Sequence, residues 1–347
     1  MTRRTPRIDR SRVRTQPARR RASKVRTRDE AHPIGAGATV SALLESLPDL
    51  LGAADLNAAI DAWERAWRRD RSVLFGFGAH LIKVGLAPVI VDLMERGAIS
   101  ALMMNGAGCV HDLELSMMGR TSEDVATALD EGSFGMARET AERLNGAIAA
   151  GRDDGLGMGA AIGRDLFESK DRHAGRSVLA NAWRLEIPVT VHAAIGTDIH
   201  HMHPSADGAA LGETSYRDFE QLVGLVAGLE GGVMLNVGSA VVLPEVFLKA
   251  LALARNLGHR VERFTTVSCD FMRPYRPQVN VVERPTRLGG RGLSLVGQHE
   301  VLIPLMAAGV IDRHEVAASR PRRKASPKTT RRKGPVGGRR PPGGKKK

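Results

Sequence analysis

Short apolar runs alternate along the chain with longer stretches in which apolar residues recur every three or four positions. The clearest stretch covers residues 55–69, where Leu56, Ile60 and Trp63 would share one face of a helix. Residues 41–50 predict a similar helix just before it. Further helices are predicted over residues 86–96, 123–150, 177–185, 216–229 and 244–257. Strands are predicted over residues 72–77, 98–104, 188–194, 232–237 and 263–268.

This repeated order of strand and helix predicts the fold class. Strands that alternate with helices pair in parallel, and the helices cover both faces of the sheet. We therefore expect an α/β fold with a Rossmann-like parallel sheet, formed by one domain over residues 40–314. Ligands of such sheets bind beyond the carboxyl ends of the strands. The polar and Gly-rich stretches of this chain lie there, and they include an expected Gly-rich loop over residues 155–163.

The charge of the chain is distributed unevenly: the two ends are basic, and the middle of the chain is acidic. Residues 1–32 carry a net charge of +9 and residues 315–347 carry +12, so residues 33–314 carry −8 of the total of +13. Both ends are rich in Arg, Pro, Ser and Gly, with little to bury, so residues 1–39 and 315–347 are expected to be disordered basic tails. They would either tether the protein to nucleic acid without sequence preference or simply keep it soluble.

Other compositional features narrow the class of protein. The two cysteines, Cys109 and Cys269, lie in different apolar segments and form neither a disulfide framework nor a zinc pattern. A reducing cytoplasm is therefore the expected compartment. No run of about 18 apolar residues predicts a membrane span, and the basic N-terminus lacks the apolar stretch of a secretory signal.

Two glycine-bearing segments at predicted strand ends could approach a ligand closely. The segment 105–108, Asn105-Gly106-Ala107-Gly108, could bring backbone N–H groups to a phosphate or ribose, or could be an ordinary tight turn. It lacks the spaced glycines of the usual dinucleotide fingerprint. The segment 76–83 contains Gly76 and Gly78 and ends in Lys83, which could hold a phosphate, act as a nucleophilic amine, or be a surface lysine at a helix start.

The densest polar cluster follows the strand predicted over residues 188–194. It contains Asp198, His200, His201 and His203. Imidazole and carboxylate groups suit zinc and other transition metals. Adjacent histidines at a strand end point in diverging directions, however, so we expect no metal site. Acid–base work or substrate binding by His200 or His203 is expected in its place.

Further candidate residues follow later strands and turns. Gly238 and Ser239 form a turn after the strand predicted over residues 232–237, and Glu245 lies in the first turn of the next helix. His111 follows the 105–108 segment, and His299 precedes an apolar run that could close a pocket. His111, Glu245 and His299 are therefore expected to contact the substrate.

In their order along the chain, these pieces resemble the deoxyhypusine synthase family. The resemblance rests on Leu81-Ile82-Lys83 after a glycine-bearing strand end, the small-residue loop and acidic follow-up at 105–114, and Thr197-Asp198 after Pro188-Val189. It continues with the glycine turn at 236–240 and the segment 293–306, and it covers most of residues 40–310.

The resemblance implies a Rossmann-like fold, NAD as cofactor, a homotetramer and a reaction on a polyamine. In that family an aminobutyl group passes through an imine on a lysine. By motif position, the residues that would line the cofactor are Gly78, Asn105, Gly106, Ala107, Gly108, Asp198, Gly238 and Ser239.

Two departures from the family affect the amine side of the reaction. At the position of the family's catalytic lysine this chain has Glu283-Arg284-Pro285, and no lysine occurs between Lys249 and the C-terminal tail. The acidic residue that the family places five positions after the aspartate is His203 here, which suits a neutral or anionic group better than a cation.

The sequence therefore favours an NAD-dependent transferase acting on a polyamine or related amine, with a substrate diverged from the hypusine pathway. Lys83 replaces the missing lysine as the candidate for an imine. Two alternatives remain: an NAD-dependent oxidoreductase or lyase on another small molecule, and a non-catalytic NAD-binding or ligand-binding protein that its tails tether to nucleic acid.

Overall fold

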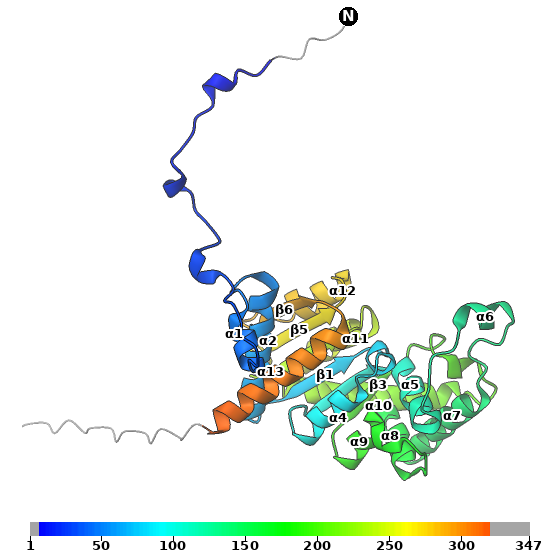
Figure 1. Cartoon of the computed structure of the whole chain (residues 1–347). Coiled ribbons are helices and arrows are strands. Elements are labelled where there is room, and N and C mark those ends of the chain that lie inside the picture. Colours follow the sequence, from blue (N-terminus) through cyan, green and yellow to red (C-terminus); the bar gives the residue numbers. More distant parts are fainter. Residues whose placement is uncertain (1–6, 320–347) are drawn as a thin grey trace, which may run out of the picture.

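The computed structural model describes residues 7–319 and contains one six-stranded sheet whose strands are all parallel (Figure 1). The strands are β1 (Val73–Phe77), β2 (Ala101–Asn105), β3 (Val189–His192), β4 (Val233–Val237), β5 (Thr265–Asp270) and β6 (Arg291–Val296). Their spatial order is β3-β2-β1-β4-β5-β6. This is the order of a Rossmann fold, in which the topology reverses between β1 and β4. The predicted α/β fold with a Rossmann-like parallel sheet is therefore confirmed.

Helices connect the strands and cover both faces of the sheet. The α-helices are α1 (Val40–Ser46), α2 (Leu51–Arg68), α3 (His80–Lys83), α4 (Ala87–Glu95), α5 (Gly106–Met118), α6 (Val125–Asp130), α7 (Arg138–Asp153), α8 (Met158–Glu168), α9 (Val178–Arg184), α10 (Gly208–Ala227), α11 (Val242–Asn256), α12 (Tyr275–Pro277) and α13 (His299–Ser319). Short turns of other helical types are η1 (Arg10–Arg12), η2 (Ala18–Arg20), η3 (Thr27–Asp29), η4 (Ala174–Arg176), η5 (Ile199–Met202) and η6 (Gln278–Glu283).

Two clusters of buried side chains lie on opposite faces of the sheet. Successive residues of a strand point to opposite faces, and in β1 Phe75 and Phe77 join one cluster while Leu74 joins the other. Helices α2, α4, α9 and α13 contribute to the first cluster, and α10 and α11 contribute to the second. Burial on both faces explains why β1 and β2 are almost entirely apolar in the sequence.

The sequence predicted five of the six strands, β1 to β5, but missed β6. β6 has only Leu293 and Leu295 buried, and its remaining positions are polar, glycine or half exposed. It lies at the edge of the sheet, where one side has no neighbouring strand. The pattern is therefore too polar to predict a strand without knowledge of its partner β5.

The prediction of a Gly-rich loop over residues 155–163 is wrong for residues 158–163, because these belong to α8, which begins at Met158. The buried carboxylate of Asp218 accepts hydrogen bonds from the N–H of Gly159 (2.8 Å) and the N–H of Val191 (2.7 Å). It therefore satisfies a free N–H at the start of α8 and ties that helix to β3. A side chain at position 159 would lie 2.2 Å from the Val189 carbonyl oxygen, so the glycine permits close packing.

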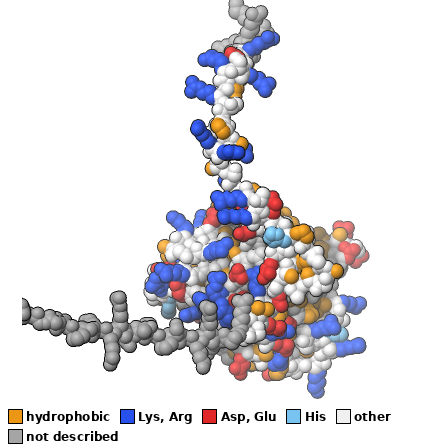
Figure 2. Space-filling view, turned by 60° about the vertical axis from the view of Figure 1, so that its left-hand side comes forward, with side chains coloured by type: hydrophobic (Ala, Val, Ile, Leu, Met, Phe, Trp, Pro, Cys, Tyr) orange, Lys and Arg blue, Asp and Glu red, His pale blue; other side chains and the backbone are white. Residues whose placement is uncertain are grey.

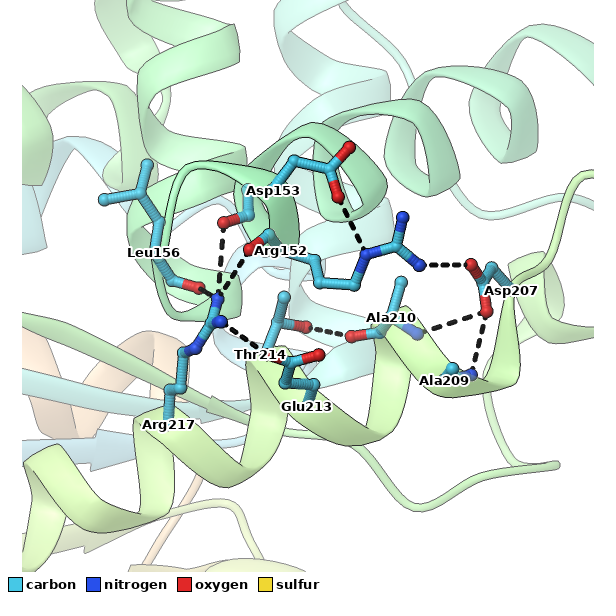
Figure 3. A network of polar contacts seen from close by, with 10 residues as sticks. Arg152, Asp153, Leu156, Asp207, Ala209, Ala210, Glu213, Thr214 and Arg217 are labelled. Atoms are coloured by element: carbon cyan, nitrogen blue, oxygen red, sulfur yellow. Dashed lines mark hydrogen bonds and ion pairs between the residues drawn. The ribbon is translucent and has the colours of Figure 1, made fainter.

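Helix α10 begins eight residues before the predicted start at residue 216, because Asp207 caps it. Asp207 accepts hydrogen bonds from the N–H groups of Ala209 (2.8 Å) and Ala210 (3.2 Å). The Asp207 carboxylate also binds the Arg152 guanidinium at 2.7 Å, and Arg217 donates to the Arg152 carbonyl at 3.0 Å (Figure 3). These contacts fix the end of α7 against α10 and thereby anchor the loop that carries residues 193–207.

The described part of the N-terminal segment, residues 7–39, has no buried side chain, and its first two thirds extend away from the sheet (Figures 1 and 2). Near its end, the Asp29 carbonyl accepts from the Asp49 N–H and the His32 N–H donates to the Ser46 carbonyl. Figure 2 shows Lys and Arg side chains spaced along it. At the other end α13 continues to Ser319, so the expected boundary at 314 falls inside this helix, and the rest of the C-terminal tail lies outside the described residues. Among the described helices, none has a segment apolar and long enough to cross a bilayer.

Candidate functional site

A cavity of about 250 Å³ lies beyond the carboxyl ends of β2 and β3. We call it the Lys83–Asp198 cavity. It draws on α3, α5, the loop between α5 and α6, and the loop after β3. Its lining residues are Lys83, Ala107, Val110, His111, Glu114, Ser122, Glu123, Val125, Phe134, Thr197, Asp198 and Ile199. Four residues expected from the sequence to form the site, Lys83, Ala107, His111 and Asp198, are thus brought together.

The carboxylate of Asp198 fills the space at the N-terminus of α5. A Cβ atom added to Gly106 would lie 2.0 Å from Asp198 Oδ2, so the glycine is what allows the carboxylate to approach. The N-terminus of a helix carries free N–H groups and a partial positive charge, and it attracts anions. The segment 105–108 was expected to offer these groups to a phosphate or ribose. In this structure the chain's own carboxylate lies there.

Burial changes the protonation of Asp198. Burial raises the pKa of Asp198 to about 6, while the N–H of Ala107 and the hydroxyl of Thr197 oppose the rise. Its Oδ2 atom is buried without a hydrogen-bond partner in the described chain. An acceptor of this kind, at the wall of a cavity, suits a hydroxyl or N–H donor from a ligand.

Asp198, His200 and His201 place three potential metal ligands within 4.8 Å of one another. The hydrogen bonds of His201 argue against a metal ion there. His201 Nδ1 accepts from the N–H groups of Gly196 (3.1 Å) and Asp198 (3.4 Å), so in the neutral ring the proton is on Nε2. A protonated nitrogen cannot bind a metal. It lies 3.8 Å from Asp198 Oδ2 and directs its N–H to the same region.

His200 and His203 do not line the Lys83–Asp198 cavity. His200 is buried, its Nδ1 lies 2.9 Å from Asn145 Oδ1, and Asn145 Nδ2 donates to the His200 carbonyl. Burial and the neighbouring His201 lower the pKa of His200 to about 4. His203 is half-buried and bonds within its own loop to Ser205. The structure therefore gives His200 a role in holding the loop to α7, and it does not bring either histidine to the cavity.

His111 is the histidine that reaches the cavity. Its ring is half-buried, and Nδ1 lies 2.7 Å from Thr121 Oγ1. Burial and the positive charge of Lys83 lower the pKa of His111 to about 4, so the imidazole is neutral near pH 7. Lys83 itself is exposed at the end of α3, on the rim of the cavity.

The residues expected around the turn after β4 form a separate, closed region. A Cβ atom on Gly78 would lie 2.2 Å from the Gly238 carbonyl oxygen, so the loops after β1 and β4 touch through their backbones. His299 is buried beneath this contact, and the hydroxyl of Ser239 accepts from the N–H of Leu243 at the start of α11. The structure thus gives Gly78, Gly238, Ser239 and His299 packing and capping contacts, and none of them lines the cavity.

Asn105 and Glu245 also lie outside the lining. Asn105 ends β2 beside the cavity, and its buried Oδ1 has no partner among the described residues. Glu245 pairs with Lys249 and Arg276 and accepts a hydrogen bond from Asn280. These contacts, with the Lys249 hydrogen bond largest, hold the pKa of Glu245 below its ordinary value.

The sequence reasoning missed two carboxylates of the cavity, Glu114 and Glu123. Glu114 is buried and accepts from Thr121 and Thr140, and Glu123 accepts from the N–H of Gly135. Glu114 lies three positions after His111 and therefore on the same face of a helix. That spacing could have revealed it if α5 had been recognised, but the glycines at its start led to the prediction of a turn.

No protein-family model matches this chain, and no curated protein matches it in sequence. Solved structures with a similar course of the chain include AgrE in a ternary complex with ornithine and NAD+ (16% identity, TM-score 0.49, 78% of this chain and 35% of AgrE). They also include a candidate LOR/SDH protein from Methanococcus maripaludis S2 (14% identity, TM-score 0.49, 76% and 70%) and a candidate deoxyhypusine synthase from Entamoeba histolytica (10% identity, TM-score 0.48, 82% and 96%). The chain thus spans about a third of the length of AgrE. The resemblance to the deoxyhypusine synthase family thus has no family match in sequence.

Proposed function

We propose that this protein is an NAD-dependent enzyme that oxidises a cationic amine bound in the Lys83–Asp198 cavity. The observation that carries the proposal is the convergence of Lys83, His111 and Asp198, from three separate sequence motifs, on one cavity. The cavity opens at the carboxyl edge of a sheet with Rossmann strand order, which is where such sheets bind their ligands.

The residues present fit the ribose part of the cofactor better than its phosphates. Asp198 Oδ2 is a buried acceptor without a partner, and acidic residues hold ribose hydroxyls in this way in dinucleotide-binding sheets. The N-terminus of α5, where a phosphate would otherwise bind, is filled by the same carboxylate. Asp198 would therefore hold a ribose, and the phosphates would lie outside this cavity. When bound, the nicotinamide accepts a hydride.

The charge of the lining favours an amine as substrate. Three carboxylates, Glu114, Glu123 and Asp198, lie around the cavity against one cation, Lys83. Opposite charges in a partly enclosed site attract a cationic ligand and orient it. With Asp198 assigned to the cofactor, Glu114 and Glu123 would take the place of the amine-binding carboxylate that the resemblance leads one to expect at His203.

Titration of the protein with NAD+ tests the cofactor. We expect the wild-type protein to bind NAD+, and Asp198→Asn to bind it about 10- to 100-fold more weakly, because a hydrogen bond to a charged group contributes about 1.5–3 kcal/mol. The measurement is isothermal titration calorimetry. Asp154→Asn is the matched control, because Asp154 pairs with Arg164 on the surface. Absence of wild-type binding at millimolar NAD+ would contradict the proposal, and binding without amine turnover would favour an oxidoreductase acting on another substrate.

The finer proposal is that the oxidised product passes to Lys83. The cation R–CH2–NH2+–R′ reacts after its nitrogen has released one proton to solvent, and the free amine R–CH2–NH–R′ then loses a hydride and a proton to become the imine R–CH=N–R′. Exchange with the Lys83 amine then gives R–CH=N–Lys83 and releases R′–NH2, so the atoms balance. Lys83 is suited to this step because it lies at the mouth of the cavity.

Borohydride reduction tests the imine on Lys83. With polyamine and NAD+ present, we expect reduction to fix an aminoalkyl group on Lys83, detected by peptide mass spectrometry, and Lys83→Ala to abolish both labelling and transfer. Lys249→Ala is the control, because Lys249 pairs with Glu245 outside the cavity. Unchanged transfer by Lys83→Ala would exclude the covalent route and leave direct transfer.

A further inference from the structure

A chain of hydrogen bonds leads from the Lys83–Asp198 cavity into the protein through His111. His111 Nδ1 lies 2.7 Å from Thr121 Oγ1, and the Thr121 hydroxyl in turn contacts Glu114 Oε2. The other oxygen of Glu114 accepts from the Thr140 hydroxyl at 3.1 Å. His111 and Glu114 lie on α5, Thr121 lies in the loop after it, and Thr140 lies on α7. The loop after α5 therefore folds back to bridge two residues of the same helix face.

The direction of these hydrogen bonds fixes the tautomer of His111. A carboxylate only accepts hydrogen bonds, so the Thr121 hydroxyl donates its single proton to Glu114. Towards His111 the Thr121 oxygen can then only accept, and His111 Nδ1 must carry the proton. Nε2 of the neutral ring is left with its lone pair, and it has no hydrogen-bond partner among the described residues. Since the ring lines the cavity, Nε2 is available to a ligand there.

Burial and the charge of Lys83 keep the free His111 ring neutral, while the carboxylates around it would still accommodate a proton. Lys83 from α3 faces it and disfavours the charged form, whereas Glu114 from α5, Glu123 from the following loop and Asp198 from the loop after β3 line the same cavity. A proton gained at Nε2 would make the ring cationic, and Glu114 would stabilise that cation through Thr121. A histidine oriented by a carboxylate in this way is a usual arrangement for a general base.

We infer that His111 Nε2 is the proton acceptor of this site, and that Thr121 and Glu114 are positioning residues that set its tautomer and orientation. The inference rests on the proposed oxidation of an amine. In that reaction the substrate carbon loses a hydride to the oxidised cofactor, and the substrate nitrogen loses its proton to His111 Nε2. The products are the imine, the reduced cofactor and a protonated His111, which returns its proton to solvent.

Nitrogen NMR of the free protein tests the tautomer without any cofactor. In long-range ¹H–¹⁵N spectra of wild-type protein we expect His111 to show a protonated Nδ1 and an unprotonated Nε2. Thr121→Val removes the hydroxyl while keeping the shape of the side chain, and it should give a mixture of the two tautomers. Thr121→Ser keeps a hydroxyl and should restore the wild-type spectrum. Thr127→Val is the matched control, because Thr127 makes an exposed hydrogen bond to Asp124 on α6.

Steady-state kinetics with amine and NAD+ provide the second readout. We expect Thr121→Val to lower kcat by about 10- to 100-fold with KM changed less than threefold, since a positioned acid or base contributes about 10²–10⁴ in rate. Thr121→Ser should recover most of kcat, and Thr127→Val should resemble wild type.

The outcomes of the two measurements separate this inference from the proposed function. A wild-type His111 with the proton on Nε2, or a Thr121→Val protein with wild-type tautomer and wild-type kcat, would overturn the inference even if NAD+ binds. The predicted tautomer in a protein that binds no NAD+ would overturn the proposed oxidation and leave the hydrogen-bonded relay supported.

Discussion

Replacement of Gly78 by alanine is expected to lower the free energy of unfolding by about 3 kcal/mol, because the new methyl group has no space. Its carbon would lie 2.2 Å from the Gly238 carbonyl oxygen and 3.0 Å from the carbonyl carbon. The backbone there cannot move away easily. Gly78 N–H donates to the Val237 carbonyl and Gly238 N–H donates to the Cys269 carbonyl, each at 2.9 Å. The substitution therefore separates β1 from β4 at the centre of the sheet.

Urea unfolding monitored by circular dichroism measures this loss. Gly146→Ala is the matched control, since Gly146 lies within α7 and a Cβ atom there would meet no atom within 4 Å. This control should be neutral or more stable by up to about 1 kcal/mol, the usual gain when alanine replaces glycine inside a helix. Equal unfolding midpoints for Gly78→Ala and wild type would show that the loops after β1 and β4 are not held together as described.

The second large effect concerns the pH dependence of stability through Asp218. Burial raises the pKa of Asp218 to about 7 although the N–H groups of Val191, Gly159 and Met158 oppose it. Because the folded protein binds this proton more tightly than the unfolded chain does, stability from this group is present at low pH and falls as the pH rises towards 7. A loss of about 3 kcal/mol between pH 5 and pH 8 follows from about two pH units at 1.36 kcal/mol each.

The variant Asp218→Asn removes the titration while keeping an oxygen to accept from the same N–H groups. We therefore expect its stability to change less than that of wild type between pH 5 and pH 8, and the variant to be relatively more stable at pH 8. Urea unfolding at both pH values measures the two differences. Asp154→Asn again serves as the surface control. Parallel pH profiles for wild type and Asp218→Asn would show that Asp218 does not titrate in this range.

The sheet was predictable from sequence because its central strands are buried on both faces. β1 has no polar residue and β4 has only Asn236, and a largely apolar run of that kind needs no knowledge of its neighbours to be recognised. Helix starts were less predictable where the capping group is distant in sequence. α8 begins where the carboxylate of Asp218 meets it, about 60 residues further along the chain. The start of α5 was missed because Gly106 and Gly108 favour a turn when considered alone.

The sequence predicted those residues of the candidate site that come shortly after the end of a strand. Lys83, His111 and Asp198 were expected there, because parallel strands bring their carboxyl ends to one edge. Thr121 depends on how the loop after α5 folds back onto Glu114, which no local pattern encodes. Gly78 and Gly238 were expected to line the cofactor. In the structure their small size allows the loops after β1 and β4 to touch. The expectations of a homotetramer, of a cytoplasmic location and of nucleic-acid binding by the tails stay predictions.

The carboxylate of Asp198 at the start of α5 has a consequence for how a ligand enters. In many sheets of this kind the ligand's own phosphate neutralises the helix terminus, and the loop settles only when the ligand arrives. Here the chain supplies that negative charge itself, so the wall of the cavity is complete before any ligand binds. The conformational entropy of this wall is lost during folding, and binding need not order it again. A preorganised cavity of this kind favours rapid entry and recognition by shape and charge over recognition by rearrangement.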